Sequence, residues 1–212
     1  MKKSAVLWTG GKDCALAFFL AIKKEIKITH LVTFVPEAPD FKAHNLEIMR
    51  KQVKSIGLPH LLLTVKPPMK ESYENAITLL KTKHNIDLLV TGDIDEIENH
   101  SNWIEECSKK SKMKIYNPLW KKNRAELLQQ LIANNFEVIF SLIKKPFFNK
   151  SWIATKLNST VISKLKELNI DICGENGEYH TMVLDAPFFN QKIVLDKFDV
   201  IEQENFYYLK IN

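Results

Sequence analysis

The chain has 212 residues, of which 45% are hydrophobic and 26% are charged, and its net charge at pH 7 is +5. This is the composition of a globular protein with a full core, and no run approaches the ~18 apolar residues of a membrane span, which excludes a membrane partner. Three scattered cysteines form no CxxC pair, and the Met1-Lys2-Lys3 start is not that of a secretory signal, so we expect a cytoplasmic protein.

Strand and helix signals alternate along the first two thirds of the chain. Short apolar runs are followed by segments in which apolar residues recur at helical spacing. In chain order the sequence predicts strands at 4–8, 28–35, 61–65, 87–91, 114–116 and 136–143, and helices at 13–24, 45–56, 71–83, 99–111 and 124–133. The alternation predicts an α/β fold, in which helices cover both faces of a parallel sheet.

The pattern changes after Ile143. Lys144-Lys145-Pro146 breaks the alternation, and a helix at 160–168 and β-like runs at 193–201 and 206–211 follow. We therefore expect a larger domain over residues 1–144 and a smaller α+β part over residues 145–212.

A glycine loop, Thr9-Gly10-Gly11-Lys12-Asp13-Cys14, joins the first predicted strand to the first helix. Paired glycines allow a ligand to approach the backbone closely, and a helix start offers N–H groups and the positive end of its dipole to an anion. Lys12 adds a mobile positive charge. The alternative is an ordinary Gly-Gly turn before a surface lysine, but the strand before and the helix after favour a phosphate loop.

The loop belongs to neither of the two common phosphate-binding types. The usual NTPase loop needs glycine and Ser or Thr where this chain has Val6 and Asp13, and the Gly-x-Gly-x-x-Gly fingerprint is absent. The loop instead resembles the Ser-Gly-Gly-Lys-Asp-Ser loop of the PP-loop ATP pyrophosphatases, which cleave ATP between the α and β phosphates. The resemblance implies that residues 9–14 bind ATP.

Gly92-Asp93 follows another predicted strand. Since ligands of parallel sheets sit beyond the carboxyl ends of the strands, this pair should lie beside the glycine loop. Magnesium prefers carboxylate and phosphate oxygens, so Asp13 or Asp93 is expected to hold Mg²⁺; the alternative for Asp93 is a helix N-cap. Apolar residues around Thr33–Val35, at the end of the second strand, should flank adenine.

A second unusual stretch is Gly174-Glu175-Asn176-Gly177-Glu178-Tyr179-His180-Thr181, which precedes a strand expected to start at Met182. Polar side chains on a glycine-supported loop beside a strand are often functional, although a turn with solvated carboxylates has the same composition. His180 is the preferred acid/base, because imidazole titrates near neutrality.

Taken together, these motifs resemble the diphthine–ammonia ligase family of the adenine nucleotide α-hydrolase superfamily. The matching residues are Thr9–Cys14, Gly92–Asp95 with His100 and Trp103, Pro118-Leu119-Trp120, Ser151-Trp152 and Gly174–Thr181. The resemblance implies a HUP-type (Rossmann-like) fold with a distinct C-terminal part. It also implies a reaction in which ATP activates the diphthine carboxylate, giving AMP and pyrophosphate, and ammonium then displaces AMP to leave an amide.

The motifs and the resemblance together predict the roles of individual residues. Catalysis is assigned to Lys12, Glu178 and His180, and Mg²⁺ binding to Asp13 and Asp93. ATP binding is assigned to Thr9, Gly10, Gly11, Lys12, Asp13, Cys14, Thr33, Gly92 and Asp93. Substrate binding is assigned to Gly174, Glu175, Gly177, Glu178, Tyr179 and Thr181. The expected partners are ATP, ammonium and a carboxylate acceptor, and a homodimer is left open.

The chain departs from the family pattern in four places. Cys14 replaces a serine, Asn176 a glycine and His180 an acid. The stretch Gly92–Asp95 with His100 also differs and looks like a bacterial branch, in which the acceptor is open. Three alternatives remain: another PP-loop ATP pyrophosphatase, such as a tRNA-modifying enzyme, a nucleotide-binding protein without turnover, and an RNA-binding protein. A nucleic-acid patch at Lys109–Lys114 is less favoured than a solvated helix end.

Overall fold

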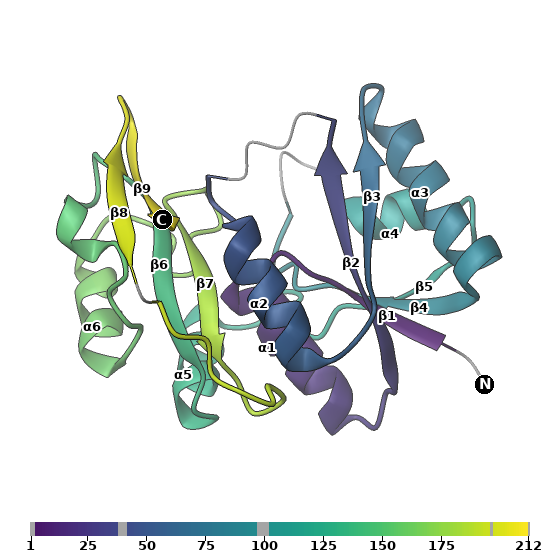
Figure 1. The fold of residues 1–212 in the computed structure, drawn as a ribbon, viewed down its shortest axis with the longest axis horizontal. Coiled ribbons are helices and arrows are strands. Elements are labelled where there is room, and N and C mark those ends of the chain that lie inside the picture. Colours follow the sequence, from purple (N-terminus) through teal and green to yellow (C-terminus); the bar gives the residue numbers. More distant parts are fainter. Residues whose placement is uncertain (1–2, 38–41, 97–101, 196, 212) are drawn as a thin grey trace. The chain divides into compact units, whose positions relative to one another are not determined.

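The computed structural model describes residues 3–37, 42–96, 102–195 and 197–211. The chain forms two compact units that interleave along the sequence (Figure 1). The first unit comprises Met1–Thr9, Asp13–Asp40 and Leu58–Lys121, and the second comprises Gly10–Lys12, Phe41–Gly57 and Lys122–Asn212. The chain thus leaves the first unit and returns to it twice, at the glycine loop and at Phe41–Gly57.

The described part of the first unit contains a five-stranded parallel sheet with strand order β3-β2-β1-β4-β5. Its strands are β1 (Lys3–Leu7), β2 (Ile28–Pro36), β3 (His60–Val65), β4 (Ile86–Val90) and β5 (Lys114–Tyr116). The helices that accompany it are α1 (Lys12–Lys23), α3 (Met69–His84) and α4 (Trp103–Ser108). Because Val6 of β1 pairs in register with Val90 of β4, the loops after these two strands leave the sheet at the same edge.

Helices pack on both faces of this sheet. On one face, Ala5 joins a buried cluster with Ile77 of α3 and Cys107 of α4. On the other face, Trp8 lies edge-on against Phe18 of α1, with the ring centroids 6.2 Å apart. Successive side chains of a strand point to opposite faces, so the apolar run of β1 serves both. The α/β fold expected from the sequence is confirmed.

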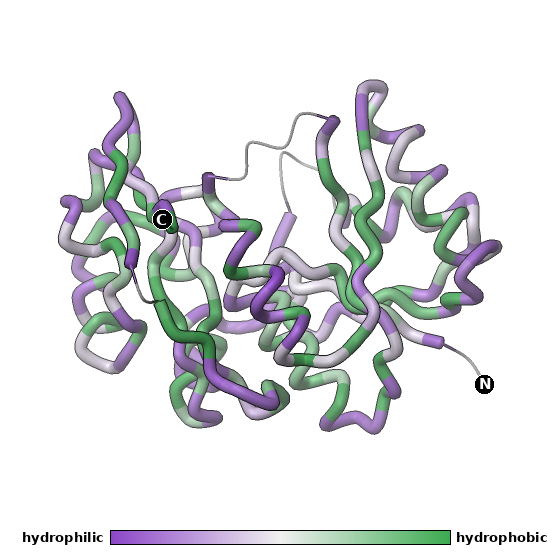
Figure 2. Tube along the Cα trace, in the orientation of Figure 1, coloured by the Kyte–Doolittle hydropathy of each residue, from purple (hydrophilic) through white to green (hydrophobic). Residues whose placement is uncertain are grey.

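The described part of the second unit contains a four-stranded antiparallel sheet with strand order β7-β6-β9-β8. Its strands are β6 (Glu137–Lys144), β7 (Tyr179–Asp185), β8 (Phe198–Glu202) and β9 (Phe206–Ile211). Its helices are α2 (Leu46–Ile56), α5 (Arg124–Ala133), α6 (Ser159–Glu167) and the short 3₁₀ helix η1 (Lys150–Trp152). Hydrophobic residues dominate β6 (Figure 2). The Phe140 ring of this strand packs on the Tyr179 ring, with the ring centroids 4.8 Å apart.

Several elements differ from the sequence-based expectation. The run at 136–143, expected to continue the strand–helix alternation, forms β6 between β7 and β9, because a mostly apolar strand suits the centre of either kind of sheet. Strand β7 begins at Tyr179 rather than Met182, and the expected strand at 193–201 forms only over Phe198–Glu202.

The expected domain boundary stays a prediction, because the two units interleave and do not test a single boundary between residues 144 and 145. The helix expected at 99–111 forms only over Trp103–Ser108 (α4) in the described part, where residues 109–112 form a turn; His100 lies outside the described residues. No helix in the described part of the chain combines the length and apolar character that crossing a membrane requires.

Candidate functional site

Two hydrogen bonds within the second unit fix the carbonyl group of Gly10. Its carbonyl oxygen accepts the Val183 N–H and the Gln52 Nε2–H, each at 2.9 Å. Gly10 has a φ of +79°, and a Cβ at this position would collide with Gln52 Oε1 and lie 2.8 Å from Met182 Cε. Only glycine meets both demands. The first glycine of the loop therefore also serves packing against β7 and α2, a role that the sequence does not reveal.

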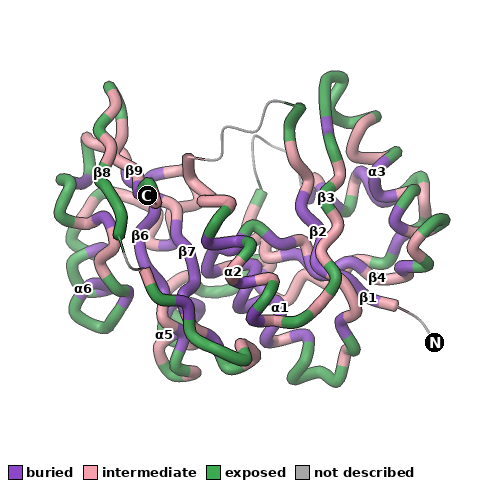
Figure 3. The backbone as a smooth tube through the Cα atoms, viewed as in Figure 1, coloured by how far each residue is buried: buried purple, intermediate pink, exposed green. Residues whose placement is uncertain are grey.

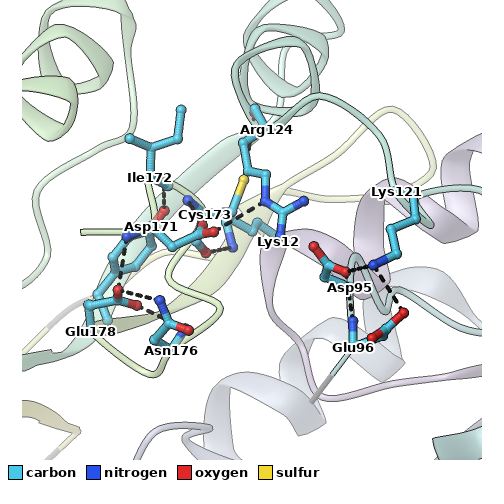
Figure 4. A network of polar contacts seen from close by, with 11 residues as sticks. Lys12, Asp95, Glu96, Lys121, Arg124, Asp171, Ile172, Cys173, Asn176 and Glu178 are labelled. Carbon is cyan, nitrogen blue, oxygen red and sulfur yellow. Dashed lines mark hydrogen bonds and ion pairs between the residues drawn. The ribbon is translucent and has the colours of Figure 1, made fainter. Parts of the chain in front are cut away.

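Lys12 is buried, with 3% of its surface exposed. Its backbone N–H donates to Thr181 Oγ1 at 3.1 Å, and its Nζ donates to the Cys173 carbonyl at 2.5 Å. The ammonium also lies 5.3 Å from the centre of the Tyr179 ring. The alternative of a surface lysine is wrong, since the side chain is buried and held by the segment that precedes β7 (Figure 4).

Glu178 organises the loop formed by residues 171–178. The carboxylate is 4% exposed; its Oε1 accepts the Asp171 N–H at 2.9 Å and the Asn176 Nδ2–H at 3.1 Å. Its Oε2 accepts the Asn176 N–H at 3.0 Å (Figure 4). Hydrogen bonds to a carboxylate are among the stronger ones in proteins. These contacts give Glu178 a structural role, and its predicted catalytic role stays a prediction.

Arg124 and Asp171 support the same loop, and the sequence analysis missed both. Arg124 Nε pairs with Asp171 Oδ2 at 3.2 Å, and Asp171 Oδ1 accepts the Cys173 N–H at 2.7 Å. The Tyr179 hydroxyl donates to the Ile172 carbonyl at 2.6 Å. Since Arg124 and Asp171 are 47 residues apart, no local pattern marks the pair.

His180 lies beside His44, a third residue that the sequence analysis missed. The two imidazole rings are edge to face, with centroids 5.4 Å apart. Burial lowers the pKa of His180 to about 4, helped by the charges of Lys12 and Lys144. Burial and His180 lower the pKa of His44 to about 4 as well. At neutral pH both rings are therefore neutral, and the pKa of His180 lies well below the value near neutrality on which its expected acid/base role was based.

This histidine pair makes stability depend on pH. An unfolded histidine, with a pKa near 6.5, takes up a proton that the folded protein binds only near pH 4. The folded state thus binds fewer protons in this window, and we expect the unfolding free energy to fall as the pH falls from 6.5 to 4. Denaturant unfolding at several pH values checks this. A His44→Gln/His180→Gln variant should lose stability less steeply, and an equally steep loss would contradict the assignment.

In the first unit, Gly92 and Asp93 lie against the start of α1. A Cβ on Gly92 would lie 2.6 Å from the Asp13 carbonyl carbon and 2.7 Å from the Cys14 nitrogen. Burial raises the pKa of the Asp93 carboxyl; the hydrogen bond from Thr91 lowers it, and the charge of Asp13 raises it. The structure thus brings together two strand-end motifs that are distant in sequence, as the parallel sheet predicts.

The magnesium ligands expected at Asp13 and Asp93 stay a prediction. Mg²⁺ binds proteins through one or two carboxylates and completes its shell with water and substrate phosphates. In the described ranges no group of three or more His, Cys, Asp or Glu residues is placed to hold a metal. The following helix, α4, is capped by Asn102 rather than by Asp93.

Most of the remaining predicted site residues are buried or half-buried within their own units. Cys14 is buried, and its Sγ accepts the Thr9 hydroxyl at 3.7 Å. Thr33 is buried in β2, where its hydroxyl donates to the Trp8 carbonyl and lies 2.8 Å from His60 Nε2. Its expected contact with adenine stays a prediction. Gly174, Glu175 and Gly177 are half-buried members of the loop at 171–178.

Comparison with known proteins identifies related sequences along nearly the whole chain. Residues 2–115 match the diphthamide synthase N-terminal domain and residues 123–212 the diphthamide synthase C-terminal domain. The diphthine–ammonia ligase of Mus musculus is 27% identical over 93% of this chain and 84% of its own length. That of Rattus norvegicus is 24% identical with the same coverage. A solved structure titled as a predicted subunit of tRNA methyltransferase from Methanocaldococcus jannaschii covers 91% of this chain and 100% of its own, at 18% identity and a TM-score of 0.47.

Proposed function

The chain belongs to the diphthamide synthase family, and we propose that it is a ligase that converts a carboxylate into an amide with ATP and ammonium. AMP and pyrophosphate are the proposed products of ATP. The observation that carries the proposal is the attachment of Gly10 and Lys12 to β7 and to the loop at 171–178. This attachment joins the residues assigned to ATP with those assigned to the acceptor.

In the proposed first step, an acceptor carboxylate oxygen bonds to the α phosphorus. The bond between the α phosphorus and the oxygen that bridges to the β phosphorus breaks, and pyrophosphate leaves. The glycine loop and the start of α1 bind the departing pyrophosphate through backbone N–H groups. Lys12 Nζ moves from the Cys173 carbonyl to the phosphates, where it offsets the developing charge. A lysine has four rotatable side-chain bonds, so this change needs no backbone movement.

In the proposed second step, ammonia displaces AMP from the acyl carbon. Ammonium is not a nucleophile until it loses a proton, and His180 accepts that proton. His180 is neutral at neutral pH and so has a nitrogen that can take up the proton, although burial lowers its pKa to about 4 and makes it a weak base in the protein without nucleotide. The loop residues Gly174, Glu175 and Gly177, with Tyr179 and Thr181, position the acceptor next to it.

Magnesium, when bound, supplies positive charge that screens the phosphate oxygens. We assign Asp13 and Asp93 as its protein ligands, since their carboxyl groups interact at the edge of the parallel sheet.

Asp93→Asn should raise the Mg²⁺ concentration for half-maximal activity about tenfold, because one anionic ligand is lost. Stability should be kept or raised, since burial raises the pKa of Asp93 and so disfavours its charged form. Magnesium titration of the rate and thermal unfolding check both parts. The matched control is Asp95→Asn, which removes a partly exposed carboxylate that pairs with Lys121 (Figure 4). An equal magnesium requirement in both variants would contradict the assignment.

The proposed reaction is tested by offering ¹⁵N-ammonium, Mg-ATP and a panel of carboxylate compounds, including a carboxylate-bearing peptide. We expect ¹⁵N in an amide product that forms only when ATP is present. Incorporation without ATP, or consumption of ATP with no nitrogen transferred to any carboxylate of the panel, would count against an ammonia ligase.

A further inference from the structure

Gln52 is a buried polar residue in the middle of α2. Its side chain is 0% exposed, whereas residues on the other side of the helix face solvent (Figure 3). Burying an amide is costly unless it is hydrogen-bonded. Gln52 Nε2 donates to the Gly10 carbonyl at 2.9 Å and to the Val183 carbonyl at 2.8 Å, so both of its protons are used. Packing alone would be served as well by leucine or methionine.

The contacts of Gln52 determine the direction of one peptide group. The Gly10 carbonyl also accepts the Val183 N–H at 2.9 Å, so two donors from different elements hold the same oxygen. The peptide between Gly10 and Gly11 is planar, and in the trans form its N–H points opposite to its C=O. Donors on α2 and β7 therefore turn the Gly11 N–H away from themselves.

The next peptide group, between Gly11 and Lys12, is also held by β7. The Lys12 N–H donates to Thr181 Oγ1 at 3.1 Å, two residues before Val183 on β7. Gly10, Lys12 and β7 thus form a continuous set of contacts, and Gln52 is the side chain that links this set to α2. Its Oε1 also fills the space where a Cβ of residue 10 would lie.

We propose that Gln52 is a positioning residue for the ATP-binding loop, which it orders by fixing the Gly10 carbonyl and thereby the direction of the Gly11 N–H. It does not touch the reacting atoms and acts through Gly10. The inference rests on the proposed function in one respect, namely that the ordered loop binds phosphates. The ordering itself is a property of the protein without nucleotide.

Two variants separate this role from simple packing. Gln52→Met keeps the length of the side chain but has no donor, and Gln52→Glu keeps its shape while turning two donated hydrogen bonds into contacts between oxygens. The matched control is Ser55→Ala on the same helix. Ser55 is also buried, but its hydroxyl donates to the Gln191 carbonyl at 2.6 Å and does not contact Gly10.

The first measurement is amide hydrogen exchange at Gly11 and Lys12 in the full-length protein without nucleotide. We expect exchange at least tenfold faster in Gln52→Met than in the wild type, and unchanged in Ser55→Ala. The second is the dissociation constant of α,β-methylene-ATP, measured by calorimetry, which should rise about tenfold in Gln52→Met, as expected for the loss of about one net hydrogen bond. Gln52→Glu should be affected more strongly in both.

The outcomes separate the two proposals. Unchanged exchange at Gly11 and Lys12 in Gln52→Met, or the same increase in Ser55→Ala, would overturn the positioning role whatever the nucleotide does. Faster exchange together with weaker binding supports it. If the wild type fails to bind α,β-methylene-ATP while Gln52→Met still accelerates exchange, the ordering role stands and the proposed function falls.

Discussion

Lys12→Met should lower the rate of pyrophosphate release by a factor of about 10² to 10³, the effect typical of removing one group that stabilises charge in a transition state. The affinity for ATP should change less, because the loop keeps its backbone contacts to β7 through Gly10. Methionine keeps most of the apolar stem of the side chain and removes the ammonium that lies over the Tyr179 ring. Initial rates and the dissociation constant of α,β-methylene-ATP separate the two effects.

The control for this prediction is Lys23→Met, at the other end of α1, where the ammonium lies 4.5 Å from the Phe19 ring. It should leave the rate unchanged. A Lys12→Met variant that keeps the full rate of pyrophosphate release with unchanged ATP binding would show that the lysine has no part in the chemistry.

Glu178→Gln should destabilise the protein by about 1–3 kcal/mol, the usual cost of leaving a buried donor without its acceptor. The carboxylate accepts three N–H groups from Asp171 and Asn176, and an amide offers only one oxygen to them. The loop at 171–178 should loosen, so the Michaelis constant for the acceptor should rise. Denaturant unfolding and steady-state kinetics measure the two consequences.

Glu202→Gln is the control for Glu178→Gln, since it removes a mostly exposed carboxylate that pairs with Lys145 at 2.7 Å in the same unit. Surface ion pairs contribute little, so this change should cost less than about 1 kcal/mol. Equal losses of stability in the two variants would mean that the three hydrogen bonds of Glu178 are not what holds the loop.

The sequence predicts the arrangement of the first unit well because its signals are local. Strand–helix alternation gives the parallel sheet, and two strand ends with glycine, at Gly10 and Gly92, give the edge at which Asp13 and Asp93 meet. The family and its class of enzyme are also confirmed, because motifs of several residues in a fixed order are specific.

What the sequence does not predict depends on contacts between distant residues. The sequence gives Gln52 no feature that separates it from other helical residues, because its amide donates to the carbonyl of Gly10, 42 positions away. The partner of Lys12 could not be predicted, because the carbonyl that holds its ammonium belongs to Cys173, 161 positions along the chain. The run that forms β6 is mostly apolar, and its pattern is the same whether its partners are parallel or antiparallel.

The most direct test of the account is to incubate the protein with Mg-ATP, ammonium and a carboxylate that gives an amide in the ¹⁵N assay, and to identify the nucleotide product. Cleavage between the α and β phosphates at the loop of residues 9–14 predicts AMP and pyrophosphate in equal amounts, with no ADP. Formation of ADP and inorganic phosphate would contradict it.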